Sequence, residues 1–274
     1  MSGGTHKPGT RVASRAFWGA SIATLTAYAL LLAGILAAIG SWTTPEIYQK
    51  ALASREIRHS LLFSVASCGL ATLLSLWVAA PTAYVLSRKH FRGKVLLEIL
   101  LDLPVVMPPL VMGLGLLLLF QTWPGRWIET SLGWRFTYTP AGVVLAQFAV
   151  ACAFAIRSLR ATFDEIPERT EQVARTLGAS DGQVLTRVVM PAAKRGLFHA
   201  AAVAWARSLG EFGPILVFAG ATRMKTEVMP TTVFLELSIG NLETAAAVSV
   251  LLLLAAAMVL LALRWLDGRE AGRS

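Results

Sequence analysis

The sequence predicts an all-α membrane protein with six transmembrane helices and both termini on the same side of the membrane. Of its 274 residues, 55% are hydrophobic and only 15% are charged, and the mean hydropathy is +0.60, well outside the range of soluble domains. Several apolar runs reach the roughly 20 residues that a helix needs to cross the hydrocarbon core. Lysine and arginine are also unevenly distributed among the connections, so the sequence predicts an orientation as well as a class.

The first two spans are predicted at 17–40 and 60–86, and a short basic segment at 1–16 precedes them. A signal peptide would have a shorter apolar core and would be followed by a soluble domain, so we expect the first span to be retained. The second span contains Pro81, which neighbouring helices can accommodate.

The third span is predicted at 108–120, directly after a break. Three prolines, Pro104, Pro108 and Pro109, fall within six residues, and proline in a helix interior removes a hydrogen bond and clashes with the preceding turn. We therefore expect a short interfacial helix, a break and then the span. The loop at 121–139 contains three tryptophans, which is typical of the membrane–water interface.

The remaining spans are predicted at 140–156, 197–220 and 243–265, followed by a basic tail at 266–274. Of the 25 lysines and arginines, 17 fall in the two terminal segments, the loop at 87–95 and a polar segment at 157–196, when Arg264 at the end of the last span is counted with the tail. Seven fall in the other three loops, and Arg207 lies within a span. This bias predicts that both termini and the segment at 157–196 are cytoplasmic.

The two cysteines, Cys68 and Cys152, both lie inside predicted spans. They form neither a disulfide framework nor a spacing typical of metal ligands, so small buried residues are the simplest interpretation. Membrane orientation accounts for the net charge of +9, and nucleic acid is not an expected partner. We expect no catalytic residue, no metal site and no cofactor-binding site in this chain.

The polar segment at 157–196 begins with a predicted helix and a tight turn. Pro167 suits the first helical position, and acidic residues including Glu171 follow in the first turn, where the helix dipole favours them. The helix is predicted to run to Leu177, because Gly178 can adopt the left-handed conformation that stops a helix.

A second helix is predicted from Ser180, with Gln183 three residues later completing a capping box, and it should end at or just before Pro191. The whole segment has about 40 residues, whereas connections between bundle helices usually have about 2–8. We favour a docking site for another protein over an ordinary connector.

The spacing in this segment resembles the signature loop of binding-protein-dependent ABC importer permeases. That loop reads Glu-Ala-Ala, three residues, Gly, nine residues and then Ile-x-Leu-Pro. Here Gln172-Val173-Ala174 precede Gly178 by the same three residues, and Val188-x-Met190-Pro191 follow after the same nine. Glu171 lies one residue before the usual acid, which leaves open which residue does the work of the acid. The resemblance extends over about 59–263.

The resemblance implies the type I ABC importer permease fold, with residues 17–265 as the transmembrane domain. In that family the loop docks on a cytoplasmic ATPase subunit, so the loop at 165–191 would couple this chain to a partner that binds ATP and Mg²⁺. The sequence has no G-x4-G-K-[ST] phosphate loop, so we expect a transport subunit rather than an enzyme. The implied coupling residues are Glu171, Gln172, Val173, Ala174, Gly178, Ala179, Ser180, Asp181 and Pro191.

Three further stretches resemble the molybdate, tungstate and sulfate branch of that family: 103–109 with Gly113, 208–213 and 240–243. The implied substrate is a tetrahedral oxyanion, molybdate or tungstate before sulfate, delivered by an extracytoplasmic substrate-binding protein. The resemblance also implies a homodimer of permeases with two ATPases in the inner membrane of a bacterium or archaeon. Sulfate systems commonly pair two different permeases instead.

Arg207 and Glu211 lie four residues apart in the fifth span and share a helix face. With Ala200 and Ala204 they belong to a stripe of small or polar residues. Ionisable groups in a span usually face the bundle interior or a water-filled path and have a partner. An unpaired carboxylate on the path would repel an oxyanion, so we expect Glu211 to be neutralised. The pair either lines the path or fixes helix packing; the path or gate candidates are Arg207, Ser208, Gly210, Glu211 and Pro214.

Two alternatives come from other classes. An ion-coupled secondary transporter usually shows interrupted helices at matching positions in two repeats, and the sequence shows one interrupted region, at 104–109, without a clear second copy. A membrane scaffold or sensor would leave both the polar segment and the charged pair without a role. In the loop at 221–242, Arg223 and Lys225 could meet an acidic rim on a binding protein.

Overall fold

A computed structural model describes the backbone of residues 9–271 and the side chains of 17–262 and 265. This part of the chain consists of α-helices and one π-helical segment and contains no strand, which confirms the all-helical class. Four of its helices are long and apolar enough to cross a membrane, or five if α4 (Lys94–Val106) and α5 (Pro109–Gln121), bent by 115°, count as one span. Residues 1–8 and 272–274 of the predicted terminal segments lie outside the described part.

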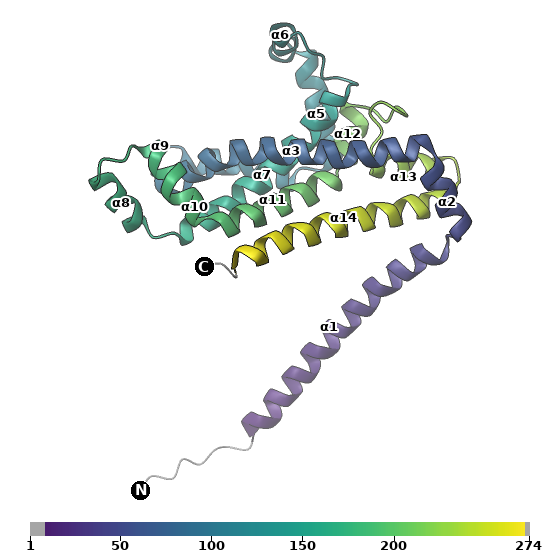
Figure 1. Cartoon of the computed structure of the whole chain (residues 1–274), viewed down its shortest axis with the longest axis horizontal. Coiled ribbons are helices and arrows are strands. Elements are labelled where there is room, and N and C mark those ends of the chain that lie inside the picture. The colour runs from purple at the N-terminus through teal and green to yellow at the C-terminus, as the bar shows by residue number, and fades with distance from the viewer. Residues whose placement is uncertain (1–8, 272–274) are drawn as a thin grey trace.

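Three helices form the centre of the bundle: α3 (Arg55–Arg88), α7 (Pro140–Glu165) and α11 (Lys194–Leu209). α3 and α7 pack along much of their length (Figure 1). Small side chains let helix backbones approach closely where lipid supplies no hydrophobic driving force. The buried alanines of this core are Ala79, Ala80, Ala83, Ala151, Ala155, Ala200 and Ala204.

α1 (Gly9–Ser41) diverges from the rest of the bundle (Figure 1). Its apolar window shows no buried residue. It meets α14 (Leu242–Ala271) near one end only, where Ala38, Ile39 and Trp42 face α13 (Met229–Ser238) and the start of α14. The short helix α2 (Pro45–Ala53) then leads into α3.

The proline-rich region breaks into α4 and α5 as predicted, and α5 packs closely against α12 (Gly213–Phe218). Glycines make this contact possible. A Cβ on Gly113 would lie 2.8 Å from Pro214 Cα, and a Cβ on Gly213 would lie 2.9 Å from Pro109 Cβ. The start of α5 therefore lies directly against the start of α12.

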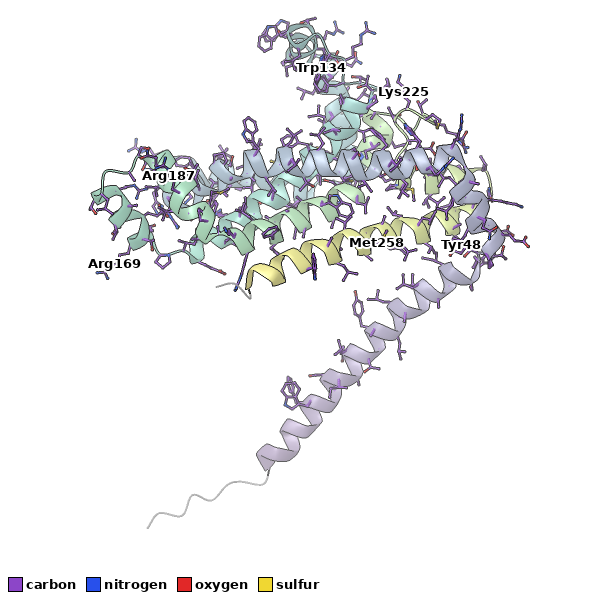
Figure 2. All side chains as sticks on the ribbon, in the orientation of Figure 1. Tyr48, Trp134, Arg169, Arg187, Lys225 and Met258 are labelled. Carbon is purple, nitrogen blue, oxygen red and sulfur yellow. The ribbon has the colours of Figure 1, made fainter. Side chains whose placement is uncertain are left out.

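α6 (Trp123–Leu132) follows α5 and projects from the bundle (Figure 1). Trp123, Trp127 and Trp134 are exposed, and Figure 2 shows Trp134 at this outer position. Exposed tryptophans agree with the predicted place of the loop at the membrane–water interface.

The predicted fourth span, 140–156, lies within a longer helix. This helix, α7, continues past Ile156 to Glu165. Arg160 in the added turns forms an ion pair with Glu98 of α4 at 3.0 Å. The charged residues that follow Ile156 in the sequence therefore lie on the last turns of α7, beyond its apolar stretch.

The predicted fifth span at 197–220 comprises two helices, because α11 ends at Leu209 and α12 begins at Gly213. Pro214 has no N–H to continue a helical ladder and is well tolerated in a first turn, so a new helix can begin there but α11 cannot continue through it. The expectation of a single interrupted region is therefore wrong: a second break lies at 210–212.

The predicted polar segment forms one end of the bundle. It contains α8 (Glu168–Thr176), α9 (Asp181–Val184), the π-helical segment Leu185–Val189 and α10 (Met190–Ala192). α2 and α13 lie at the opposite end (Figure 1).

Candidate functional site

The turn after α8 has the predicted stop at Gly178. Its φ is +89°, in the left-handed region that glycine adopts without a Cβ penalty. The Gly178 N–H donates to the Arg175 carbonyl at 3.0 Å, and the Ala179 N–H donates to the Ala174 carbonyl at 3.1 Å. These two bonds form a Schellman motif, which satisfies carbonyls that the end of the helix would otherwise leave free.

The second helical stretch starts with the predicted capping box. Gln183 N–H donates to Ser180 Oγ at 3.4 Å, and Ser180 N–H donates to Gln183 Oε1 at 3.0 Å. The stretch then continues through the π-helical segment to Pro191, and Val184 and Val189 are fully buried in the core that also contains Leu159. This half of the segment is fixed by apolar packing.

α8 is held instead by one buried carboxylate, that of Glu171, whose side chain is 1% exposed. Tyr84 Oη donates to Glu171 Oε2 at 2.7 Å, and Arg88 Nε donates to Glu171 Oε1 at 2.6 Å. Arg175 Nη2 adds a longer contact at 3.4 Å. A buried carboxylate is stable when its lone pairs are satisfied in this way.

Arg88 connects three helices at once. Besides Glu171 of α8, its Nη2 donates to the Phe163 and Ile166 carbonyls at 2.8 and 2.9 Å. These carbonyls belong to the end of α7, where a cation complements the helix dipole. The ends of α3 and α7 are therefore bound to α8 through one guanidinium group.

The opposite face of α8 is open and partly apolar. Leu177 is 83% exposed and Val173 is 55% exposed, and the two lie one helical turn apart. Arg169 and Arg187 are also exposed, and Figure 2 places both at this end of the molecule. An exposed apolar pair on a helix fixed by a buried ion pair is a suitable contact surface for another protein.

Among the predicted coupling residues, the structure separates anchors from surface. Glu171 is the buried acid, whereas Gln172, at the position of the usual acid, is exposed. Ala174 and Ala179 are half-buried against the core. The remaining predicted positions are exposed: Val173, Gly178, Ser180, Asp181 and Pro191.

Arg207 and Glu211 form the predicted ion pair at the second helix break. Arg207 Nη2 lies 2.7 Å from Glu211 Oε1, with 1% of the Glu211 side chain and 31% of the Arg207 side chain exposed. The guanidinium also lies over the Phe154 ring at 5.5 Å. Glu211 lies within the break at 210–212. The ion pair therefore joins α11 to the break and does not link two turns of one helix.

The other candidates of this group have different surroundings. Ser208 is fully buried, and its carbonyl accepts a hydrogen bond from Gln147 Nε2 at 3.3 Å. Pro214 packs on Gly113, and Gly210 caps α11. Ala200 and Ala204 of the same stripe are buried in the central core, so the stripe does not line a continuous open path within the described chain.

Sequence reasoning missed Tyr84 and Arg88, the partners of Glu171. Arg88 was counted only among the charges of the loop at 87–95, and Tyr84 lies inside an apolar span. Their separation from Glu171, by 87 and 83 residues, leaves no local pattern that could have revealed the contact.

Comparisons with known proteins identify the family of this chain. Residues 71–271 match the family described as "Binding-protein-dependent transport system inner membrane component". The chain is 33% identical to the sulfate transport system permease protein CysT of Escherichia coli strain K12, over 74% of this chain and 76% of that protein. It is 37% identical to the molybdenum transport system permease protein ModB of Mycobacterium tuberculosis strain H37Rv, with the same coverage. The molybdate/tungstate permease protein WtpB of Pyrococcus abyssi is 33% identical over 78% of each chain.

Two solved structures show the same fold. A chain of a bacterial alginate ABC transporter, crystallised with a periplasmic protein, matches with a TM-score of 0.75 over 94% of this chain and 95% of that one. A chain of the MetNI methionine ABC transporter matches with a TM-score of 0.55 over 79% and 96%. Their sequence identities are 15% and 16%.

The Glu171 anchor can be tested with Glu171→Gln, which keeps the size of the side chain and removes its charge. Breaking one partner of a buried ion pair costs on the order of 3 kcal/mol, so α8 should open roughly a hundred times more often. Trypsin cleavage after Arg169 and Arg175 should accelerate accordingly in the purified protein. Glu168→Gln, on the exposed side of the same helix, is the matched control; equal cleavage rates in both variants would contradict the anchor.

Proposed function

The chain belongs to the family of inner-membrane components of binding-protein-dependent transport systems, and we propose that as an ABC importer permease it carries a tetrahedral oxyanion into the cytoplasm. The oxyanion class is supported by the names of the relatives, which include sulfate, molybdenum and molybdate/tungstate permeases. We place molybdate and tungstate first because the molybdenum permease is 37% identical, against 33% for both the sulfate permease and the molybdate/tungstate permease. Sulfate is the second candidate.

We propose that the end formed by α8–α10 faces the cytoplasm and docks on an ABC ATPase. The observation that carries this proposal is the exposed pair Val173 and Leu177, presented by a helix whose other face is fixed through Glu171. The excess of lysine and arginine on this side supports the orientation. ATP and Mg²⁺ would bind to the ATPase partner, because the sequence of this chain has no phosphate loop.

The proposed topology is that of a type I importer permease with six spans. α1, α3, α7 and α14 each supply one span. The bent pair α4–α5 and the interrupted pair α11–α12 supply the other two. In this arrangement both termini are cytoplasmic, while α2, α13 and the loop before α13 face outward toward a substrate-binding protein, in the inner membrane of a bacterium or archaeon.

Docking and substrate can be tested together in proteoliposomes that contain the permease with its ATPase. Uptake of molybdate, tungstate or sulfate should require ATP and the external binding protein. Leu177→Asp should abolish ATPase retention and uptake, because it places a charge in an apolar contact. Leu177→Met should retain both, since it preserves size and polarity.

The thermal transition of Leu177→Asp should match that of the unchanged protein, because the side chain is 83% exposed. Uptake by the permease alone, driven by an ion gradient without ATP, would refute the importer and favour a secondary transporter. The second helix break at 210–212 does not favour that alternative, because it interrupts the fifth proposed span whereas the first break precedes the third. These are not matching positions in two halves of three spans.

We propose that Arg207 and Glu211 belong to the translocation path or its gate, together with Ser208, Gly210 and Pro214. Support comes from their position at a helix break and from the partial exposure of Arg207 beside the buried Glu211. A paired carboxylate there presents less negative charge to an oxyanion. The alternative is a purely structural pair that fixes α11 against the break.

Glu211→Gln distinguishes the two roles. A path role predicts that oxyanion uptake and its coupling to ATP hydrolysis change several-fold while the thermal transition changes little, because the substitution frees the charge of Arg207. A structural role predicts a lower transition temperature with normal uptake per folded molecule. Glu46→Gln, on the exposed surface of α2, controls for the loss of one negative charge.

We propose that two copies of this chain form the permease, and that α1 takes part in the contact between them. α1 is apolar over residues 17–41, has no buried residue in its apolar window and diverges from its own bundle. A second copy would cover the face that this bundle leaves open.

Leu31→Cys places a thiol on an exposed position of α1, and a bifunctional maleimide should then link two copies in membranes. The two natural cysteines, Cys68 and Cys152, are buried, so the unchanged protein is the control and should give no dimer. A link to a different permease chain alone would refute the homodimer.

A further inference from the structure

A cavity of about 310 Å³ lies at the end of the bundle opposite to α8. Four parts of the chain meet around it: α2, the start of α3, the loop before α13 with α13 itself, and the start of α14. Tyr48 of α2 and Lys225 of the loop mark this end of the molecule in Figure 2. The ionisable groups of its lining are Lys50, Glu56, Arg223, Glu227, Glu236 and Glu243.

The charge of this lining is unbalanced. Four carboxylates face two cationic groups. Arg223 is already engaged, because its Nη1 pairs with Glu56 and its Nη2 with Glu236 at 2.9 Å. Glu236 is further bonded by Asn241 Nδ2 at 2.9 Å. Arg223, one of the two loop cations expected to meet an acidic rim on a binding protein, is thus paired with acids of its own chain, and the cavity beside it has an excess of negative charge.

Among the described residues of this lining, Glu227 is the group with a buried oxygen that has no hydrogen-bond donor. Its side chain is buried, at 1% exposed, and its Oε2 accepts no hydrogen bond within the described part of the chain. Thr232 also lines the cavity, and its hydroxyl partly offsets the effect of burial on Glu227. That hydroxyl has one proton, for which Ser60 Oγ and the Val228 carbonyl are acceptors within hydrogen-bond distance. A buried acceptor without a donor costs free energy, and a donor that enters the cavity would recover it.

Burial raises the pKa of the Glu227 carboxyl above its ordinary value. This direction is the one expected for a carboxylate that has lost water and gained no sufficient counter-charge. An incoming cation would favour the ionised form and oppose the shift.

The shape and chemistry of the cavity select among cations. Within the part of the chain that the structure describes, no three His, Cys, Asp or Glu side chains are close enough together to hold a metal ion. The volume is also about ten times the roughly 30 Å³ share of one water, which suits an extended side chain better than a bare ion. An oxyanion would be repelled by the excess of carboxylates.

We propose that this cavity receives a lysine or arginine side chain of the external binding protein when that protein docks on the permease. The inference rests on the proposed importer function, which places this end of the bundle outside the cytoplasm. Glu227 at the base would accept a charge-assisted hydrogen bond from the ammonium or guanidinium group. Glu243, exposed at the rim, would attract the cation before contact.

The test uses the complete complex of permease and ATPase in nanodiscs, with the purified binding protein that stimulates its ATP hydrolysis as the probe. The concentration of binding protein that gives half-maximal stimulation should rise about ten-fold or more for Glu227→Gln. It should rise several-fold for Glu243→Gln, which is exposed and does not alter the interior. Glu46→Gln removes a charge from α2 outside the cavity and should leave it unchanged.

Carbodiimide coupling identifies the occupant. The reagent activates a carboxyl group, and a lysine amine then displaces the activating group as a urea and forms an amide bond. A link between Glu227 or Glu243 and a lysine of the binding protein supports the proposal. Weakened stimulation in Glu227→Gln without such a link also supports it, with arginine as the occupant, because guanidinium does not couple.

Two outcomes overturn the proposal. One is a link from Glu227 to Lys50 of its own chain or to a second permease copy. The other is unchanged half-maximal stimulation in both cavity variants. In either case the binding protein still stimulates ATP hydrolysis, so the importer function stands. Absence of any stimulation in the unchanged complex would instead refute the proposed function.

Discussion

The buried ion pair between Arg88 and Glu171 is the interaction on which the polar end of this molecule depends. Glu171 is the one buried residue of α8, a helix described over its whole length, so apolar packing does little to place that helix. An ionised carboxylate removed from water is costly unless it is paired and hydrogen-bonded. Only one position of α8 satisfies Glu171 with both Tyr84 and Arg88, and this requirement fixes the helix at the end of α3.

The same guanidinium extends this constraint into the bundle. Arg88 also binds carbonyls at the end of α7, and α7 packs along α3 and against α11. In the proposed importer, a force applied to Leu177 would therefore pass to packed helices and not only to a loop. The bundle is interrupted at 107–108 and 210–212, and the two breaks meet where α5 approaches α12. These are the places where the transmembrane structure has the fewest continuous backbone hydrogen bonds.

The two ends of the molecule differ in the way their charges are arranged. At the α8 end, Arg88 and Arg175 pair with the buried Glu171, and other arginines lie at the surface. At the α2 and α13 end, Arg223 pairs with Glu56 and Glu236, and Glu227 Oε2 has no hydrogen-bond donor within the described residues. Counting charges in a loop is enough to predict membrane orientation, because that rule depends on composition. It cannot predict the sign of a surface, because the sign depends on which charges pair.

The sequence by itself determined the helical membrane class, the break at the prolines, the stop at Gly178 and the capping box at Ser180. Each of these depends on side chains and backbone within a few residues, so local chemistry is sufficient. Tertiary structure decided which acid anchors α8, where α11 ends and which buried carboxylate oxygen, that of Glu227, has no hydrogen-bond donor. The partners of Glu171 lie 83 and 87 residues away, and burial makes Glu227 costly only after four parts of the chain have met around it. Contacts between distant residues set these energies, and no local pattern encodes them.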